Sequence, residues 1–106
     1  MYITVFVTAC SKKESDKIAR RLVQKRLAAC ANVIPGISSF FRWKGRVNNC
    51  RECLLVIKTK KSLFSRLAGE VRACHSYSVP EIIALPVVAG TKEYLSWINE
   101  SVGDAV

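Results

Sequence analysis

The sequence predicts an α+β sandwich of the ferredoxin-like plan, in which an antiparallel sheet carries two helices on one face. Half of the 106 residues are apolar, which is enough to build one hydrophobic core. Segments with strand and helix periodicity follow the order βαββαβ, and a short helix ends the chain. Two of the strand segments are long and form a central hairpin. We expect residues 1–106 to form a single domain.

The first predicted strand is residues 2–8, where β-branched and aromatic residues dominate. Ser11 and Glu14 then match a capping box, in which the serine hydroxyl accepts the Glu14 N–H while the glutamate reaches back to the start of the helix. The helix that follows has one apolar side and one cationic side. Its apolar residues recur at helical spacing: Ile18, Ala19, Leu22, Val23 and Leu27.

The central hairpin is predicted from residues 31–43 and 46–59, joined by a tight turn at Lys44-Gly45. Pro35-Gly36 interrupts the first of these strands, because proline cannot donate a ladder hydrogen bond, and the pair suits a bulge or a bend.

Thr59 is the expected cap of a second helix, whose apolar stripe runs to Cys74 and which stops near His75. Residues 79–88 are the last predicted strand, with prolines 80 and 86 at its ends or on an edge. Gly90-Thr91 then opens a short helix that bears Tyr94, Leu95, Trp97 and Ile98.

A hairpin this long and an uncovered apolar sheet face predict self-association, because free edges and exposed apolar surface are hidden at low cost by symmetric contacts. We therefore expect a closed homo-oligomer.

The formal charge is +9, and the cations lie mostly in residues 11–29 and 42–61. The strand order also occurs in RNA-recognition modules, but these stack bases on aromatic residues of the third strand, and residues 53–59 contain none. We therefore predict no nucleic-acid partner, and we assign the cations to solvated surfaces. No apolar stretch approaches the ~20 residues that span a membrane, so no membrane partner is expected.

Several blocks of sequence, in order along nearly the whole chain, resemble the CutA divalent-cation tolerance family. They are residues 26–32 (RLAACAN), 35–37 (PGI), 43–45 (WKG), 55–59 (LVIKT), 75–83 (HSYSVPEII), 85–87 (LPV), Gly90 and 94–97 (YLSW). The resemblance implies a ferredoxin-like homotrimer packed through its sheets, and a role in metal tolerance. It also implies a metal near Cys74 and His75, together with a strand cysteine whose position is held here by Val7. Ser76 stands where the family usually has proline.

Cys74 and His75 place a thiol and an imidazole side by side, and copper(I) favours such ligands. Cys10, just after the first strand, is the candidate third ligand. Copper or another divalent cation is thus the expected bound ion, and no cofactor is required for folding. In the alternative, structural interpretation, Cys74 completes the apolar helix stripe and His75 hydrogen-bonds a carbonyl near the helix end.

The remaining cysteines are expected to be free thiols. Cys50 and Cys53 form a CxxC pair within a predicted strand, where positions i and i+3 point to opposite faces. Only a bulge at Asn48-Asn49 would bring them together. Cys30 lies among small apolar residues, which is typical of a buried, inert thiol. An odd number of cysteines without a preceding secretory signal indicates reduced thiols and a cytoplasmic protein.

The resemblance also implies a cleft between subunits, near which lie the remaining polar-tipped and charged candidates: Trp43, Lys58, Tyr77, Glu81, Tyr94 and Trp97. Lys58 and Glu81 are expected to converge at a subunit boundary, either as a ligand site or as a structural salt bridge. A PII-like regulatory trimer, binding a small anion near Lys58 and Arg42 or a protein partner, is the alternative function. No nucleophile elbow or phosphate-binding loop is present, so we expect no enzymatic activity.

Overall fold

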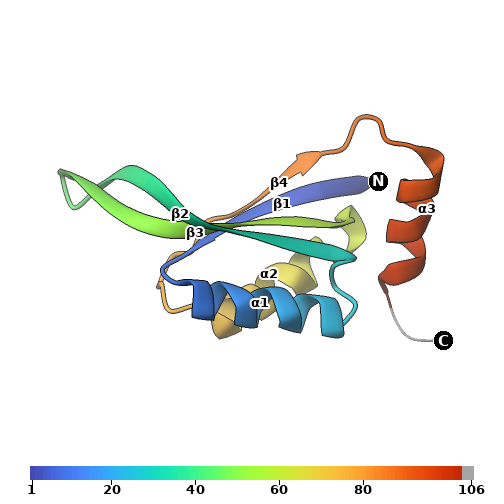
Figure 1. The fold of residues 1–106 in the computed structure, drawn as a ribbon, viewed down its shortest axis with the longest axis horizontal. Helices are drawn as coiled ribbons and strands as arrows, with labels where there is room; N and C mark the ends of the chain where they lie inside the picture. Colours follow the sequence, from blue (N-terminus) through green and yellow to red (C-terminus); the bar gives the residue numbers. More distant parts are fainter. Residues whose placement is uncertain (104–106) are drawn as a thin grey trace.

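A computed structural model describes residues 1–103 and contains one four-stranded antiparallel sheet and three α-helices. The strands are β1 (Tyr2–Ala9), β2 (Cys30–Trp43), β3 (Arg46–Lys60) and β4 (Ile82–Pro86), in the spatial order β2-β3-β1-β4. Helices α1 (Lys12–Gln24) and α2 (Phe64–Cys74) lie together on one face of the sheet, and α3 (Lys92–Ser101) lies at one end (Figure 1). This confirms the predicted α+β class and element order. Within the described residues, no helix is long and apolar enough to cross a membrane.

The central strand β1 separates the two faces of the sheet by strict alternation. Ile3, Val5, Val7 and Ala9 are buried against the helices, whereas the residues between them are only partly buried. Ser11 caps α1 as predicted, because its Oγ accepts the Glu14 N–H at 3.1 Å. The apolar side of α1 packs on this strand through Ile18, Ala19 and Leu22.

The β2-β3 hairpin follows its predicted course and extends beyond the helices (Figure 1), so that the molecule measures 46 Å along its longest axis. The register shifts between Ile34 and Ile37, and Gly36 there has φ +72°, which confirms the bulge at Pro35-Gly36. Lys44 and Gly45 both have positive φ, as a two-residue hairpin turn requires.

Two predicted boundaries were wrong. Thr59 does not cap a helix: it is buried in β3, and its hydroxyl donates to the Leu27 carbonyl at 2.7 Å. A 3₁₀ turn over Lys61–Leu63 instead leads into α2, without a side-chain cap. The last strand is also shorter than residues 79–88, because pairing with β1 extends only from Ile82 to Pro86.

The short C-terminal helix begins as predicted, since the Thr91 hydroxyl accepts the Tyr94 N–H at 3.4 Å. Its Ile98 packs with Ala29, Leu63 and Val102 in a second, smaller core. Helix α3 therefore covers one end of the sheet and leaves the face opposite α1 and α2 open.

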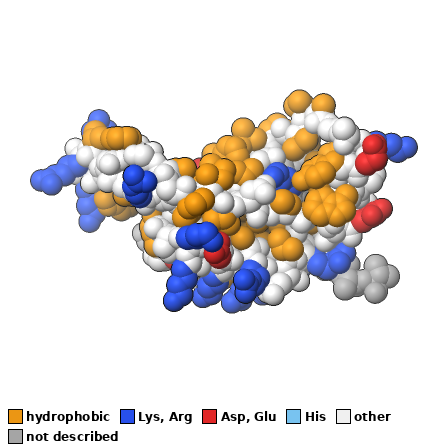
Figure 2. All heavy atoms as spheres, in the orientation of Figure 1, with side chains coloured by type: hydrophobic (Ala, Val, Ile, Leu, Met, Phe, Trp, Pro, Cys, Tyr) orange, Lys and Arg blue, Asp and Glu red, His pale blue; other side chains and the backbone are white. Residues whose placement is uncertain are grey.

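The open face of the sheet retains apolar side chains that a single chain does not cover. Ile34, Ile83 and Leu85 are all more than two-fifths exposed. In Figure 2, hydrophobic side chains gather over the upper part of the molecule, while lysines and arginines line the lower edge beneath α1. The exposed apolar surface is therefore on the sheet side, and much of the positive charge is on the helix side.

Candidate functional site

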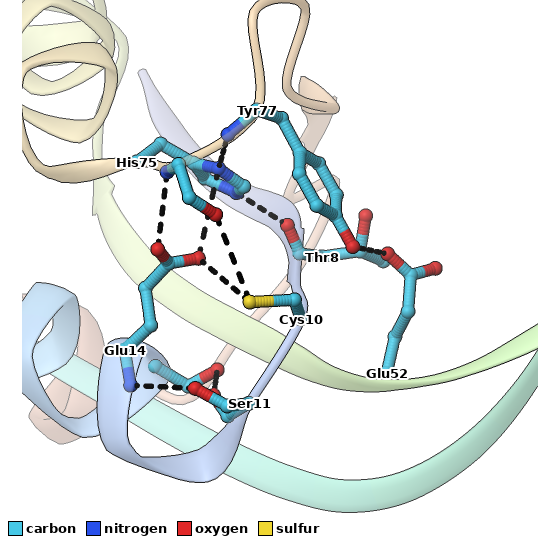
Figure 3. Close-up of polar contacts among 9 residues, drawn as sticks. Thr8, Cys10, Ser11, Glu14, Glu52, His75 and Tyr77 are labelled. Atoms are coloured by element: carbon cyan, nitrogen blue, oxygen red, sulfur yellow. Dashed lines mark hydrogen bonds and ion pairs between the residues drawn. The ribbon is translucent and has the colours of Figure 1, made fainter.

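The first candidate site lies where β1 passes into α1 and meets the end of α2. We call it the β1–α2 junction and define it by Thr8, Cys10, Glu14, His75 and Ser76 (Figure 3). Strand β1 ends at Ala9 and α1 is capped by Ser11, which leaves Cys10 in the connection between them. His75 is the C-cap residue of α2 and has extended backbone, which turns the chain back across the end of β1.

His75 uses both ring nitrogens in hydrogen bonds. Its side chain is fully buried, Nε2 lies 2.7 Å from the Thr8 carbonyl oxygen, and Nδ1 accepts the Tyr77 N–H at 3.1 Å. A carbonyl only accepts and an amide N–H only donates, so these partners place the hydrogen on Nε2. The ring therefore ties the loop after α2 to β1. The sequence prediction that His75 bonds a carbonyl is confirmed, although that carbonyl belongs to β1.

Glu14 links the other members of the junction. Its Oε1 accepts the Ser76 N–H at 3.0 Å, and its Oε2 lies 3.7 Å from both the Cys10 Sγ and the His75 Nδ1. Cys10 Sγ is also 3.6 Å from Ser76 Oγ. The carboxylate thus bonds a loop 62 residues away, rather than closing a capping box as the sequence predicted. A thiol, a carboxylate and an imidazole consequently meet at one point.

Cys74 takes no part in these contacts, because its side chain packs against the main hydrophobic core. The structure therefore brings two of the three predicted ligands, Cys10 and His75, to the junction, whereas Cys74 lies apart from them. Across residues 1–103, no three Cys, His, Asp or Glu side chains are arranged to hold a metal ion. Any bound metal requires a rearrangement of the junction.

A second candidate site is a cavity of about 630 Å³ between the hairpin and the loop that precedes β4. Three of the predicted cleft residues, Trp43, Tyr77 and Glu81, line it. Glu52 of β3 and two hairpin aromatics, Phe40 and Phe41, complete its main walls. Glu52 was not among the predicted cleft residues, since a charged residue in a long strand gives no local signal of where its side chain points.

Two carboxylates control the electrostatics of the cavity. Glu52 is 8% exposed and accepts a hydrogen bond from the Tyr77 hydroxyl at 2.7 Å (Figure 3). Burial, the hydrogen bond to Glu52 and the negative charge of Glu52 all raise the pKa of Tyr77, so its hydroxyl remains a donor. Partial removal from water and the charge of Glu52 raise the pKa of Glu81.

The other predicted cleft residues lie elsewhere on the subunit. Lys58 is six residues from Glu52 along β3, roughly 20 Å away, and its Nζ donates to the Asn32 side chain. Trp97 is on α3, where its ring packs against Tyr94 at 5.5 Å. Arg42 is not a lining residue of the cavity. A single subunit therefore gives this cavity a negative lining.

The CxxC pair behaves as a regular strand predicts. Cys53 is buried, and Cys50, three residues before it, points to the opposite face. Pairing with β2 is regular at Asn48 and Asn49, so no bulge brings the two thiols together. Cys30 is partly buried, and its thiol donates to the Asn32 side chain at 3.7 Å.

Comparison with known proteins decides the family. A family model described as "CutA1 divalent ion tolerance protein" matches residues 3–101. The chain belongs to this family. A divalent-cation tolerance protein CutA from Thermus thermophilus is 46% identical over 99 residues, which are 93% of this chain and 96% of that protein. The human protein CutA is 47% identical over 104 residues, and the match covers 95% of this chain but 58% of the human protein.

Solved CutA structures share the fold. The Thermus thermophilus protein superimposes with a TM-score of 0.96 at 45% identity, covering 97% of this chain and all of the other. CutA1 from Oryza sativa gives a TM-score of 0.94 at 41% identity, covering 98% and 95% of the two chains. The resemblance inferred from the sequence motifs is therefore confirmed. The CutA family is named for tolerance of divalent cations and not for a reaction.

Proposed function

We propose that this CutA protein is a cytoplasmic homotrimer of ferredoxin-like subunits, which contributes to metal tolerance by binding copper or another divalent cation. It acts as a binding protein and not as an enzyme. Membership of the CutA family supports metal tolerance in general. The observation that carries the specific proposal is the β1–α2 junction, where Cys10, Glu14 and His75 meet.

The donor chemistry of the junction suits copper. Thiolate and imidazole are the ligands that soft copper(I) prefers, and a carboxylate can complete a site for a harder divalent ion. The Cys10 thiol donates to Glu14, so this carboxylate is placed to receive the proton that the thiol must lose to bind a metal. To bind the metal through Nδ1, His75 must also give up the hydrogen bond that Nδ1 accepts from the Tyr77 N–H. Cys74 precedes His75 directly and is the second thiol of the proposed set.

The residues of the loop after α2 are compatible with such an exchange. Ser76 replaces the proline that the family resemblance leads one to expect, and serine does not fix φ as proline does. The loop is attached to the junction through the Ser76 N–H, the Tyr77 N–H and the Ser76 hydroxyl. A small shift of this loop frees both Nδ1 of His75 and the Cys10 thiol.

Copper(I) titration under anaerobic conditions tests this proposal. Competition with a chromophoric chelator is expected to show one copper per subunit in the wild type. Cys10→Ser, Cys74→Ser and His75→Gln should each weaken binding by at least tenfold. Glutamine is chosen because its amide can still donate to the Thr8 carbonyl.

Cys30→Ser is the matched control, since Cys30 is a partly buried thiol that pairs with Lys58 near the C-terminal end of β3, away from the junction. It should bind copper like the wild type. Unchanged affinity in both Cys10→Ser and His75→Gln would remove the junction as the metal site. Equal losses in the three cysteine variants, together with unchanged binding in His75→Gln, would indicate non-specific thiol binding.

A further inference from the structure

The outward side of α1 carries a groove that the proposed metal function does not use. Its volume is about 400 Å³, and it is lined by Lys13, Asp16, Lys17, Arg20, Arg21 and Gln24. Three exposed cations, Lys13, Lys17 and Arg20, recur there at spacings of four and three residues, so they form one row along the helix, which we call the α1 stripe. In Figure 2, lysines and arginines gather along this edge. Subunit contacts through the open face of the sheet leave the groove accessible.

Both carboxylates of α1 are engaged with other partners. Asp16 lines the groove but pairs with Lys12 at 2.7 Å. Glu14 points into the β1–α2 junction, where its Oε1 accepts the Ser76 N–H. The helix therefore provides no ion pair for the α1 stripe.

The neighbouring helix α2 has one carboxylate, and this group also pairs elsewhere. Glu70 contacts Nη1 of Arg21 at 3.3 Å and Nζ of Lys25 at 3.1 Å. Within residues 1–103, the three cations of the α1 stripe thus form no ion pair. Like charges three and four residues apart on a helix repel each other, so an anion bound along the stripe stabilises this side of α1.

The composition of the groove restricts the kind of anion. No aromatic ring lines it, so a nucleic-acid base has nothing to stack on. No apolar side chain lines it either, because the apolar side of α1 is buried against the sheet, and a lipid surface therefore gains no inserted group. Lysine and arginine bind phosphoryl oxygens through charge-assisted hydrogen bonds. The stripe extends about 10 Å along the helix axis from Lys13 to Arg20, farther than a single phosphate reaches.

We propose that the groove on α1 binds a linear polyphosphate chain, with Lys13, Lys17 and Arg20 contacting successive phosphoryl groups. The recognised chemistry is the row of phosphoryl groups, which occurs in free inorganic polyphosphate and in the tail of a nucleoside triphosphate. This site is separate from the proposed metal site, since no residue of the β1–α2 junction lines the groove.

A series of anions of increasing length tests the proposal. Isothermal titration of metal-free wild-type protein should show affinity rising from phosphate through pyrophosphate to tripolyphosphate, because each added group reaches a further cation. Tripolyphosphate should bind at least tenfold more tightly than phosphate. Absence of tripolyphosphate binding, or equal affinity for phosphate and tripolyphosphate, would overturn the proposal.

ATP and AMP distinguish the two sources of the phosphoryl chain. If ATP binds like tripolyphosphate and AMP binds like phosphate, the groove accepts the chain from either source. If tripolyphosphate binds and ATP does not, the site takes free polyphosphate. Equal affinity for ATP and AMP would show recognition of the nucleoside and reject the proposal.

Two double variants that remove the same charge locate the site. Lys17→Gln/Arg20→Gln should weaken tripolyphosphate binding by at least tenfold. Lys61→Gln/Lys92→Gln is the matched control, since both of these lysines are exposed and neither lines the groove, and it should bind within twofold of the wild type. Equal losses in the two double variants would show that the net charge of +9, and not the groove, attracts the anion.

A gain of affinity provides a test that a misfolded variant cannot mimic. Gln24 lines the groove four residues after Arg20, so Gln24→Lys extends the α1 stripe by one cation. A longer polyphosphate should bind Gln24→Lys more tightly than the wild type. Ser65→Lys adds the same charge at an exposed position of α2 and should bind like the wild type. An unchanged affinity in Gln24→Lys would contradict the placement of the chain along the stripe.

Two macromolecular polyanions are the competing occupants. Tighter binding of an oligothymidylate than of a polyphosphate with the same number of phosphoryl groups would assign the groove to single-stranded nucleic acid. Flotation with phosphatidylserine vesicles that is lost only in Lys17→Gln/Arg20→Gln would assign it to an anionic membrane. Either outcome rejects the polyphosphate site without bearing on copper binding at the junction.

Discussion

At the scale of single residues, the candidate sites depend on side chains whose partners are distant in sequence. Glu14 bonds Ser76, 62 residues away, and Tyr77 bonds Glu52, 25 residues away. The sequence identified Cys10, His75 and Tyr77 by chemistry, but it assigned Glu14 to a local cap and passed over Glu52. Local patterns identify the residue types that can react or bind. The fold decides which of them meet.

Glu81 gives a prediction about pH. Partial removal from water and the nearby charge of Glu52 raise the pKa of Glu81 above its ordinary value of 4.5, so the folded state holds this proton more tightly than the unfolded state does. The stabilising contribution of the proton is complete below the unfolded pKa, and it is lost as pH rises through the folded pKa. The Glu81→Gln variant lacks this pH-dependent contribution. The free energy of unfolding of the variant, relative to that of the wild type, should therefore increase from about pH 4 to about pH 7.

Urea unfolding at a fixed subunit concentration measures this difference. Glu93→Gln serves as the control, since Glu93 is on the first turn of α3 and does not line the cavity. A stability difference between Glu81→Gln and the wild type that stays constant over this pH range would show that Glu81 is ordinarily solvated.

At the scale of elements, the sequence predicted best where one short segment contains the whole signal. The first strand, the cap at Ser11, the start of the last helix at Gly90-Thr91, the bulge at Pro35-Gly36 and the Lys44-Gly45 turn are all local features and were confirmed. The prediction failed at Thr59, whose hydroxyl bonds a carbonyl 32 residues earlier in the chain. A cap and a buried strand threonine look alike in sequence, and only the tertiary contact distinguishes them.

Two glycines should respond in opposite ways to alanine. Gly36 has φ +72° in the bulge of β2, so Gly36→Ala places a side chain in left-handed backbone and should cost about 1 kcal/mol. Gly69 lies within α2, and a methyl group added there meets nothing within 4 Å. Gly69→Ala should therefore stabilise the protein by about 0.5–1 kcal/mol.

Thermal and urea unfolding of the two variants against the wild type, at equal subunit concentration, check this pair. A stabilised Gly36→Ala variant would show that the bulge does not need left-handed backbone at this position. A destabilised Gly69→Ala variant would show that α2 is crowded around Gly69 in the assembled protein.

At the scale of the whole molecule, much of the positive charge lies on the helix side of the subunit, and exposed apolar side chains lie on the open face of the sheet. The helices cover one face of the sheet, while Ile34, Ile83 and Leu85 remain exposed on the other. The sequence predicted this uncovered face from the length of the hairpin and the number of helices available to cover the sheet. The proposed trimer buries that face and leaves the cationic side of α1 outward.

If the subunits contact one another through the open face of the sheet, a charge introduced on that face should disrupt the trimer, whereas a charge on the helix side should not. Ile83 pairs with Phe6 on the open face of the sheet and is 51% exposed. Ile83→Glu should convert the trimer to monomers, because it places a charge in the proposed contact without a partner. Val23→Glu is the matched control, since Val23 is 42% exposed on the helix side. Analytical ultracentrifugation should show this control still trimeric, and a trimeric Ile83→Glu variant would exclude the sheet face as the contact.

The central claim is that this CutA protein is a trimer that binds copper at the β1–α2 junction, and native mass spectrometry tests both halves of it at once. Untagged protein is loaded anaerobically with copper(I), desalted and measured beside Cys10→Ser and Cys30→Ser. The account predicts three chains carrying three copper ions in the wild type and in Cys30→Ser, and three chains without retained copper in Cys10→Ser. Single chains, or a trimer that retains the same copper in all three proteins, would contradict it.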